Sequence, residues 1–289
     1  MFSKDTLKGK KILITGGGSG LGLSMAKAFA AHGADVAICG RDEEKLKNAL
    51  QEIQNVKVSE SKAIYHPCDV RDYEQVKNTI QYCVQELGGL NGLVNNAAGN
   101  FLALSEDLTP NGFKAVTDIV LQGSFNCSHA FGKYIIENKI PQSDILNIVT
   151  TYTQSGCAFV LPSACAKAGV YAMTMTLAFE WACYGIRCNA IAPGPFPTKG
   201  AWDRLMPSKD LEKFYIQRIP MKRYGEHEEL TNLAVFMMSD MARYLNGECV
   251  TIDGGEHLQN GQFNFFAQMF TQEQIKQVFR EVRERNKKN

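Results

Sequence analysis

The sequence lacks the features that would place the protein in a membrane or on a nucleic acid. No apolar run reaches the ~18 residues that a membrane-spanning helix needs. Its 31 Lys and Arg are balanced by 30 Asp and Glu, so the formal net charge is only +1. Such a balance gives no electrostatic reason to expect nucleic acid or an anionic membrane as a partner. We therefore expect neither.

The nine cysteines are scattered and show no metal-binding pattern. No pair has the spacing of zinc ligands, and the sequence contains no Cys-x-x-Cys. We expect no metal site. Cys39, Cys165, Cys188 and Cys249 lie among apolar residues, which is typical of small core residues in a reducing compartment.

Targeting signals are also absent from the two ends of the sequence. The first eleven residues contain neither an apolar signal region nor an arginine-rich transit sequence. The last four, Asn286-Lys287-Lys288-Asn289, are not a peroxisomal address. This pattern favours a cytoplasmic protein, although a processed organellar protein would look the same.

Short apolar runs alternate with helical patterns along the chain. Strands are expected at residues 11–15, 35–39, 63–68, 90–95, 145–150, 187–192 and 249–253, and helices at 19–31, 42–53, 72–87, 111–137, 163–184 and 226–238. Strands separated by helices are parallel and joined by right-handed crossovers. Apolar strands such as Ile12-Leu13-Ile14 fit a sheet that is covered on both faces. The pattern predicts a doubly wound, Rossmann-like parallel α/β sheet.

No linker or internal repeat divides the sequence, so residues 1–289 are expected to form a single domain. Residues 195–223 break the alternation and contain prolines at 195, 197, 207 and 220; we expect a helical lid there. Residues 271–289 read as a C-terminal helical extension, whose apolar stripe comprises Ile275, Val278, Phe279 and Val282. The stripe packs either on its own subunit or on a second one.

A glycine-rich turn, Thr15-Gly16-Gly17-Gly18-Ser19-Gly20-Leu21-Gly22, joins the first strand to the first helix. The first glycine makes a tight turn, and the later ones let the helix N-terminus approach a diphosphate. A glycine cluster alone is weak evidence, but here the strand, loop and helix follow in the required order. We therefore expect a dinucleotide to be bound by Thr15, Gly16, Gly18, Ser19, Gly20, Leu21 and Gly22.

The end of the second strand indicates which dinucleotide is bound. An NAD site favours an acidic residue for the ribose 2′-hydroxyl, whereas a 2′-phosphate favours arginine. Arg41 occupies the turn, which favours NADP(H), although a solvated loop charge is the alternative. Asp42 comes one place late and is more typical of a helix cap. Asp69, after the third strand, binds the adenine amine or caps the helix beginning near Asp72.

The fourth strand ends in Asn95-Asn96-Ala97-Ala98-Gly99. Small residues there let the backbone lie against a cofactor. Asn95 is expected to tie neighbouring strands together. Asn100, just beyond Gly99, is expected to point toward a substrate cleft.

Together these motifs resemble the short-chain dehydrogenase/reductase superfamily over nearly the whole chain. The matching residues are Thr15 to Gly22, Asp69, Asn95 to Gly99, Lys167 and Pro193-Gly194-Pro195. The resemblance implies cofactor contacts at Asn96, Ala97, Lys167, Pro193, Gly194, Pro195 and Phe196. It also implies that Lys167 holds the nicotinamide ribose and lowers the pKa of a proton-donating tyrosine.

The sequence departs from the superfamily pattern at two positions. Ser163 stands one helical turn before Lys167, where the superfamily has its tyrosine. Val120 stands where the superfamily has the asparagine of an Asn-x-x-Gly pair that ends at Gly123. An ordinary carbonyl-reductase proton relay is therefore doubtful.

A narrower resemblance, to the 2,4-dienoyl-CoA reductases of mitochondria and some bacteria, accounts for both departures. It is carried by residues 95–101, 117–121 and 161–167, and by residues 193–195 followed by 198–201. In that family the catalytic tyrosine lies fifteen residues before the lysine, which here is Tyr152. Tyr152 follows the fifth strand, at the sheet edge where doubly wound folds place substrate chemistry.

This resemblance implies NADPH-dependent reduction of 2,4-dienoyl-CoA to 3-enoyl-CoA in the β-oxidation of unsaturated fatty acids. Tyr152 and Asn100 would bind the thioester oxygen; Ser163 would bond the cofactor or the substrate carbonyl, or else cap a helix. Acyl-CoA contacts are implied at Arg71, Phe101, Thr109 and Arg204. A homotetramer is also implied. The alternatives are an ordinary reductase of 3-oxoacyl thioesters or other carbonyl substrates, and a non-catalytic nucleotide-binding regulator.

Overall fold

The computed structural model describes residues 2–58, 60–198 and 208–287. Within them, seven parallel strands form one sheet in the order β3-β2-β1-β4-β5-β6-β7. The strands are β1 (Lys11–Thr15), β2 (Asp35–Gly40), β3 (Ala63–Pro67), β4 (Gly92–Asn95), β5 (Ser143–Ile148), β6 (Ile186–Pro193) and β7 (Cys249–Ile252). The predicted strands are thus confirmed, with ends shifted by up to two residues.

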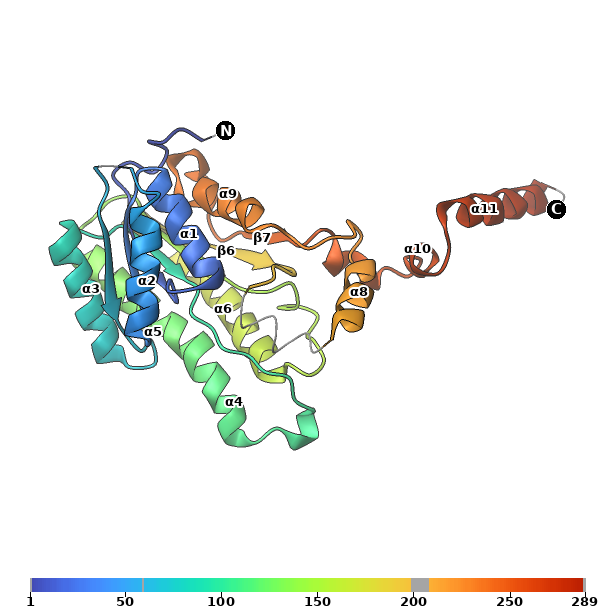
Figure 1. The fold of residues 1–289 in the computed structure, drawn as a ribbon, viewed down its shortest axis with the longest axis horizontal. Coiled ribbons are helices and arrows are strands. Elements are labelled where there is room, and N and C mark those ends of the chain that lie inside the picture. Colours follow the sequence, from blue (N-terminus) through green and yellow to red (C-terminus); the bar gives the residue numbers. More distant parts are fainter. Residues whose placement is uncertain (1, 59, 199–207, 288–289) are drawn as a thin grey trace.

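Helices cover both faces of this sheet (Figure 1). One core contains side chains of α1 (Gly20–Ala31), α2 (Glu43–Gln54) and α9 (His227–Met238). The other contains side chains of α3 (Tyr73–Leu87), α5 (Gly123–Glu137) and α6 (Leu161–Glu180). The predicted doubly wound α/β fold is therefore confirmed. No described helix is long and apolar enough to cross a membrane.

The long helix expected over residues 111–137 is interrupted. It consists of α4 (Pro110–Thr117), a π-helical turn η2 (Asp118–Gln122) and α5. Val120 lies in the π turn, is only 1% exposed and packs against α6 residues such as Ala166 and Val170. π turns of this kind are frequent at functional sites. Val120, which departs from the superfamily pattern, therefore makes an apolar contact with the helix that contains Lys167.

Two of the four cysteines expected in the core are buried, namely Cys39 and Cys188. Cys165 is exposed. It lies two residues after the buried Ser163 on α6, and this spacing places it on the outer side of the helix. Cys249 is half-buried because β7 is an edge strand. The expectation for these two residues was wrong, since an apolar neighbourhood in sequence does not specify the face.

The C-terminal extension leaves the body of the protein. Helices α10 (Phe265–Met269) and α11 (Gln272–Lys287) lie beside the rest of the chain in Figure 1, not on it. The apolar stripe meets α10 instead, where the Phe266 and Phe279 rings have centroids 5.7 Å apart. Within the described residues the stripe therefore packs on α10 of its own subunit, and its packing on a second subunit stays a prediction.

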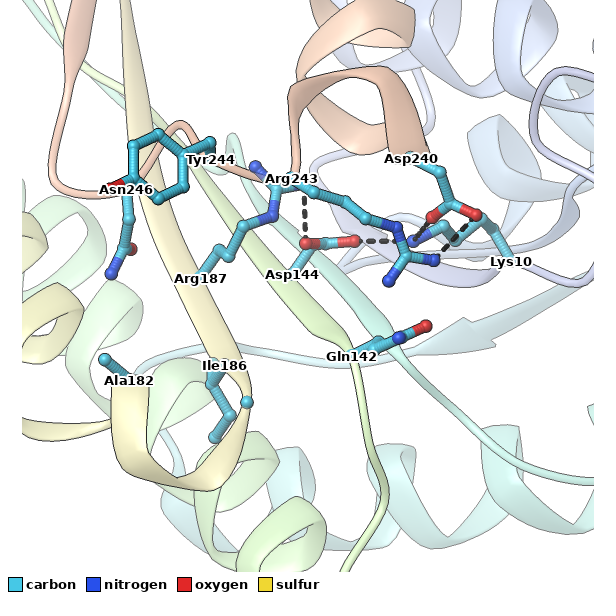
Figure 2. A pocket seen from close by; sticks show the side chains of 11 residues that line it. Lys10, Gln142, Asp144, Ala182, Ile186, Arg187, Asp240, Arg243, Tyr244 and Asn246 are labelled. Atoms are coloured by element: carbon cyan, nitrogen blue, oxygen red, sulfur yellow. Dashed lines mark hydrogen bonds and ion pairs between the residues drawn. The ribbon is translucent and has the colours of Figure 1, made fainter.

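The amino ends of the strands are held by a network of ion pairs, shown in Figure 2. The carboxylate of Asp144 lies 2.8 Å from Lys10 Nζ and 2.7 Å from Arg187 Nη2, and Lys10 also pairs with Asp240 at 3.2 Å. A cavity of about 340 Å³ lies here. Because doubly wound sheets bind ligands at the carboxyl ends of their strands, we assign this network to holding β1, β5 and β6 together.

Candidate active site

The glycine-rich loop after β1 has the shape that a dinucleotide diphosphate requires. Gly16 has a φ of +65° and donates its N–H to the carbonyl of Cys39 at 2.8 Å, which fastens the loop to the end of β2. A Cβ on Gly22 would lie 2.4 Å from the Gly16 oxygen, so only glycine fits. Ser19 precedes α1 without capping it through its side chain, which leaves backbone donors at this helix N-terminus for a phosphate.

The side chains of Thr15 and Asn96 lock this loop to the end of β4. The Thr15 hydroxyl accepts hydrogen bonds from the backbone N–H groups of Asn96 and Ala97, both at 3.0 Å. The Asn96 amide donates to the Thr15 carbonyl at 3.0 Å. Each side chain thus shapes the cofactor cradle by binding the backbone of the opposite segment.

Asn95 has the structural position that the sequence predicted. Its amide nitrogen donates to the Ser128 hydroxyl on α5 and to Asn147 Oδ1 on β5, both at 2.8 Å. These bonds tie β4 to its neighbouring strand and to the helix above it. That prediction is confirmed.

A cavity of about 550 Å³ lies beside the glycine loop, at the end of β2. Its lining includes Gly18, Gly40, the exposed Arg41 and Lys45. The side chain of Asp42 accepts the Lys45 N–H at 3.1 Å and caps α2, as the sequence predicted. Lys45 is a cavity residue that sequence reasoning missed, although its place four residues after Arg41 was a usable signal.

Asp69 is held by Arg71 rather than by a helix. It accepts from the Arg71 backbone N–H at 3.1 Å and from Arg71 Nε at 2.9 Å, and this contact lowers the pKa of Asp69. Helix α3 is capped by Asp72, which accepts from the Glu74 and Gln75 N–H groups. The reading of Asp69 as the helix cap is therefore wrong, and its possible contact with adenine stays a prediction.

Tyr152, Ser163 and Lys167 come together at the carboxyl end of β5. Tyr152 lies in the loop four residues beyond the strand, and its hydroxyl is 3.1 Å from Ser163 Oγ. Ser163 and Lys167 are four residues apart on α6, share one face and are both buried. Because α6 begins at Leu161 with Val160 as its cap residue, the reading of Ser163 as a helix cap is wrong.

Burial determines the protonation of this group. Lys167 donates to the Ile148 carbonyl, and desolvation lowers its pKa to about 8. Burial raises the pKa of Tyr152, and the Ser163 hydroxyl opposes this effect. At neutral pH the tyrosine therefore carries its proton and can donate a hydrogen bond, beside a lysine that is still mostly charged.

The loop after β4 brings Asn100 toward the same edge of the sheet. The Asn100 amide oxygen accepts the Phe101 N–H at 2.9 Å, which leaves its NH₂ group as the donor. Farther along, the Ala103 N–H donates to the Phe159 carbonyl at 2.9 Å and ties this loop to the one that contains Tyr152. This hydrogen bond joins the two loops but does not join the side chains of Asn100 and Tyr152. Their convergence on one oxygen therefore stays a prediction.

The predicted acyl-CoA residues are distributed unevenly. Phe101 and Thr109 are neighbours across Gly112, whose N–H is accepted by the Thr109 hydroxyl that caps α4. Arg71 is bound to Asp69 and lies apart from them in the chain. Arg204 lies outside the described residues.

The segment after β6 packs tightly on the end of β7. The Gly194 N–H donates to the Ile252 carbonyl at 2.9 Å, and a Cβ on Gly194 would lie 2.4 Å from Asp253 Cβ. The Phe196 ring is buried against Gly225. A cofactor contact at Phe196 would therefore use its backbone, which the motif alone did not reveal.

A dinucleotide loop, a buried lysine and a tyrosine at the carboxyl ends of a doubly wound sheet define a nicotinamide-dependent oxidoreductase. Residues 16–257 match the family model described as Enoyl-(Acyl carrier protein) reductase. The chain belongs to the short-chain dehydrogenase/reductase superfamily.

Several curated relatives in this superfamily have related names. A "Probable 2,4-dienoyl-CoA reductase [(2E)-enoyl-CoA-producing]" of Bacillus subtilis is 44% identical, over 86% of this chain and 97% of its own. A "Probable 2,4-dienoyl-CoA reductase 3 [(3E)-enoyl-CoA-producing]" of Caenorhabditis elegans is 41% identical, over 88% and 83%. The crystal structure of a short chain dehydrogenase from Bacillus anthracis is 44% identical with a TM-score of 0.78, and covers 87% of this chain and 98% of that one.

We expect the buried charge of Lys167 to lower the free energy of unfolding. Lys167→Met removes a charge whose folded pKa is about 8 against an ordinary value of 10.5. After the lost bond to Ile148 is subtracted, we expect the free energy of unfolding of the cofactor-free protein at pH 7 to rise by about 2 kcal/mol. Denaturant unfolding at several pH values measures this difference.

The pH dependence provides the control. Between pH 8 and 10.5 the folded wild-type protein has released this proton while the unfolded chain retains it, so wild-type stability rises with pH. The gap between wild type and Lys167→Met should therefore close as the pH rises above 8. A gap that is constant across this window would contradict the burial of a charged lysine.

Proposed function

We propose that this chain is an NADPH-dependent 2,4-dienoyl-CoA reductase that forms 3-enoyl-CoA in the β-oxidation of unsaturated fatty acids. The observation that carries the proposal is the 3.1 Å contact between Tyr152 and Ser163, one helical turn before Lys167. It gives the site a tyrosine from a strand end in place of the tyrosine missing from the helix. The names of the relatives from Bacillus subtilis and Caenorhabditis elegans support the same substrate class.

A conjugated dienoyl thioester suits a tyrosine in this position. Bound NADPH would supply a hydride to the δ-carbon of the diene. Negative charge then flows along the conjugated system to the thioester oxygen, several bonds away. Donors aimed at that oxygen are the main requirement, and losing one such donor typically costs ~3–4 kcal/mol.

Four side chains would divide this work. The Tyr152 hydroxyl and the Asn100 amide donate hydrogen bonds to the thioester oxygen. Ser163 orients the Tyr152 hydroxyl, which it contacts in the structure. Lys167 would hold the nicotinamide ribose. The surroundings of Tyr152 raise the pKa of its hydroxyl, so the hydroxyl keeps the proton that it donates to the oxygen.

The proton that completes the reduction comes from Tyr152 or from a water molecule, and it goes to carbon. Protonation at Cα leaves the double bond between carbons 3 and 4, which is the 3-enoyl product. Protonation at Cγ would give the 2-enoyl product instead. The names of the relatives include both outcomes, (2E)-enoyl in Bacillus subtilis and (3E)-enoyl in Caenorhabditis elegans. We favour Cα because the oxygen donors hold the thioester end of the dienolate in place.

The cavity at the end of β2 supports NADPH rather than NADH. Arg41 and Lys45 give it two cations. Asp42, the only acid among the described residues of its lining, caps α2 and pairs with Lys45 Nζ at 3.0 Å, so Arg41 is the cation that Asp42 does not neutralise. A guanidinium and an ammonium suit the 2′-phosphate of NADPH, whereas the 2′-hydroxyl of NADH would need an acceptor.

The remaining features of the proposal concern substrate entry and assembly. Phe101, Thr109 and Arg71 would contact acyl-CoA, with Arg71 shared between Asp69 and a CoA phosphate. The segment 195–223, of which residues 199–207 lie outside the described part of the chain, would cover the substrate. The exposed stripe of α11, including Phe279 and Val282, supports contact between subunits of a homotetramer. A cytoplasmic location completes the proposal.

The cofactor preference is tested by Arg41→Ala. Loss of a charge-assisted bond to phosphate should raise the Kd for NADPH by about tenfold or more and leave the Kd for NADH nearly unchanged. Fluorescence titration of both nucleotides measures the two constants. Lys47→Ala is the matched control, because Lys47 is a nearby cation on α2 that pairs with Glu43 and Glu44 and is not among the residues that line the cavity. Equal losses for both nucleotides would contradict a 2′-phosphate site.

The role of Tyr152 is tested by Tyr152→Phe. Removing one oxyanion donor should lower kcat for 2,4-hexadienoyl-CoA by about 10²–10³-fold. NADPH affinity and the melting temperature should stay close to wild type. Ser163→Ala should cost less, because it leaves the donor in place but less well oriented. Unchanged turnover in Tyr152→Phe would refute the relocated tyrosine.

A further inference from the structure

Within the described residues, hydrogen bonds join helix α8 (Lys209–Arg218) to the turn after β7 and to Tyr224. None of its ten residues is buried, and it lies at the edge of the body nearest α10 (Figure 1). Its position therefore depends on specific contacts more than on core packing.

The firmest of these contacts lead to one turn after β7, the 3₁₀ helix η5 (Glu256–Asn260). The Tyr215 hydroxyl donates to Glu256 Oε1 at 2.5 Å. One helical turn later, Arg218 Nη2 donates to Gln259 Oε1 at 3.0 Å, and the Gln259 amide donates back to the Arg218 carbonyl. A carboxylate acceptor makes the first bond the stronger one.

Glu256 is also in contact with the candidate active site. Its Oε2 lies 3.3 Å from the place where a Cβ on Gly194 would stand, in the segment proposed to border the cofactor. Burial, followed by the charge of Glu256, raises the pKa of Cys157, which lies in the same loop as Tyr152. Glu256 thus stands between α8, the loop of Tyr152 and the segment after β6.

We infer that the hydrogen bond between Tyr215 and Glu256 holds α8 beside the acyl-CoA site, which makes Glu256 a positioning residue for substrate binding. The inference rests on the proposed function for the identity of the substrate. Neither Tyr215 nor Glu256 is among the described residues that line the cavity at the end of β2, where Arg41 lies. Breaking the bond should therefore weaken substrate binding and spare NADPH binding.

Steady-state kinetics of Tyr215→Phe test this separation. We expect the KM for 2,4-hexadienoyl-CoA to rise about tenfold, as loss of a hydrogen bond to a charged group implies, with kcat and the Kd for NADPH near wild type. Glu256→Gln keeps an acceptor for Tyr215 and should show a smaller rise. Tyr184→Phe, which removes a hydroxyl from an exposed tyrosine near the amino ends of the strands, is the control. A loss confined to kcat, or a matching loss of NADPH affinity, would overturn the inference.

The rate at which N-ethylmaleimide modifies Cys157 gives a readout that needs no substrate. Cys157 is exposed, and peptide mass spectrometry separates it from the other exposed thiols at Cys165 and Cys183. Burial raises the pKa of Glu256 and the Tyr215 hydrogen bond opposes this rise, so Tyr215→Phe also affects the charge beside the thiol. Glu256→Gln, which removes that charge and keeps an acceptor for Tyr215, is therefore the control: modification faster in Tyr215→Phe than in Glu256→Gln reports movement of α8. We expect modification to be several-fold faster than in wild type.

The two readouts separate failure of the inference from failure of the proposed function. If the protein does not turn over dienoyl-CoA, the proposed function fails, and faster modification of Cys157 in Tyr215→Phe still supports the bond as the attachment of α8. If dienoyl-CoA is reduced but Tyr215→Phe matches wild type in both KM and modification rate, the inference is wrong and the proposed function stands.

Discussion

The candidate site depends on the burial of one ammonium group. Lys167 is 6% exposed and donates to a backbone carbonyl at the end of β5, and burial lowers its pKa to about 8. No carboxylate of the described residues forms an ion pair with it. A buried charge without a carboxylate partner is costly, so the surrounding structure has to fix its position. The end of β5, the first turns of α6 and the π turn that carries Val120 enclose it.

Around that lysine, the hydroxyl donor is supplied from a different element than the helix pattern implies. In α6 the position one turn before Lys167 is the small Ser163, and the loop after β5 supplies the Tyr152 hydroxyl to the same place. A donor held on a strand-end loop can serve an oxygen that is remote from the carbon receiving hydride, as dienoyl thioester chemistry requires. The absence of a tyrosine at position 163 of the helix therefore favours conjugated thioesters over ordinary carbonyl compounds as substrates.

Local patterns predicted most of the fold, because buried parallel strands and strand–glycine–helix turns are set by neighbouring residues. The same patterns placed Asn95 between strands and Asp42 on a helix end. They did not decide whether Asp69 or Ser163 caps a helix, since both residue types cap helices and both also bind partners. They also missed the bond between Tyr215 and Glu256, which are 41 residues apart and are joined only by tertiary folding.

The account is tested most directly by comparing initial rates of NADPH oxidation with 2,4-hexadienoyl-CoA and with acetoacetyl-CoA under the same conditions. A site built around thioester-oxygen donors should turn over the diene much faster and leave the 3-oxo thioester nearly unreacted. Identification of a 3-enoyl-CoA product would add the predicted site of protonation. Faster reduction of acetoacetyl-CoA would contradict the account and indicate an ordinary carbonyl reductase.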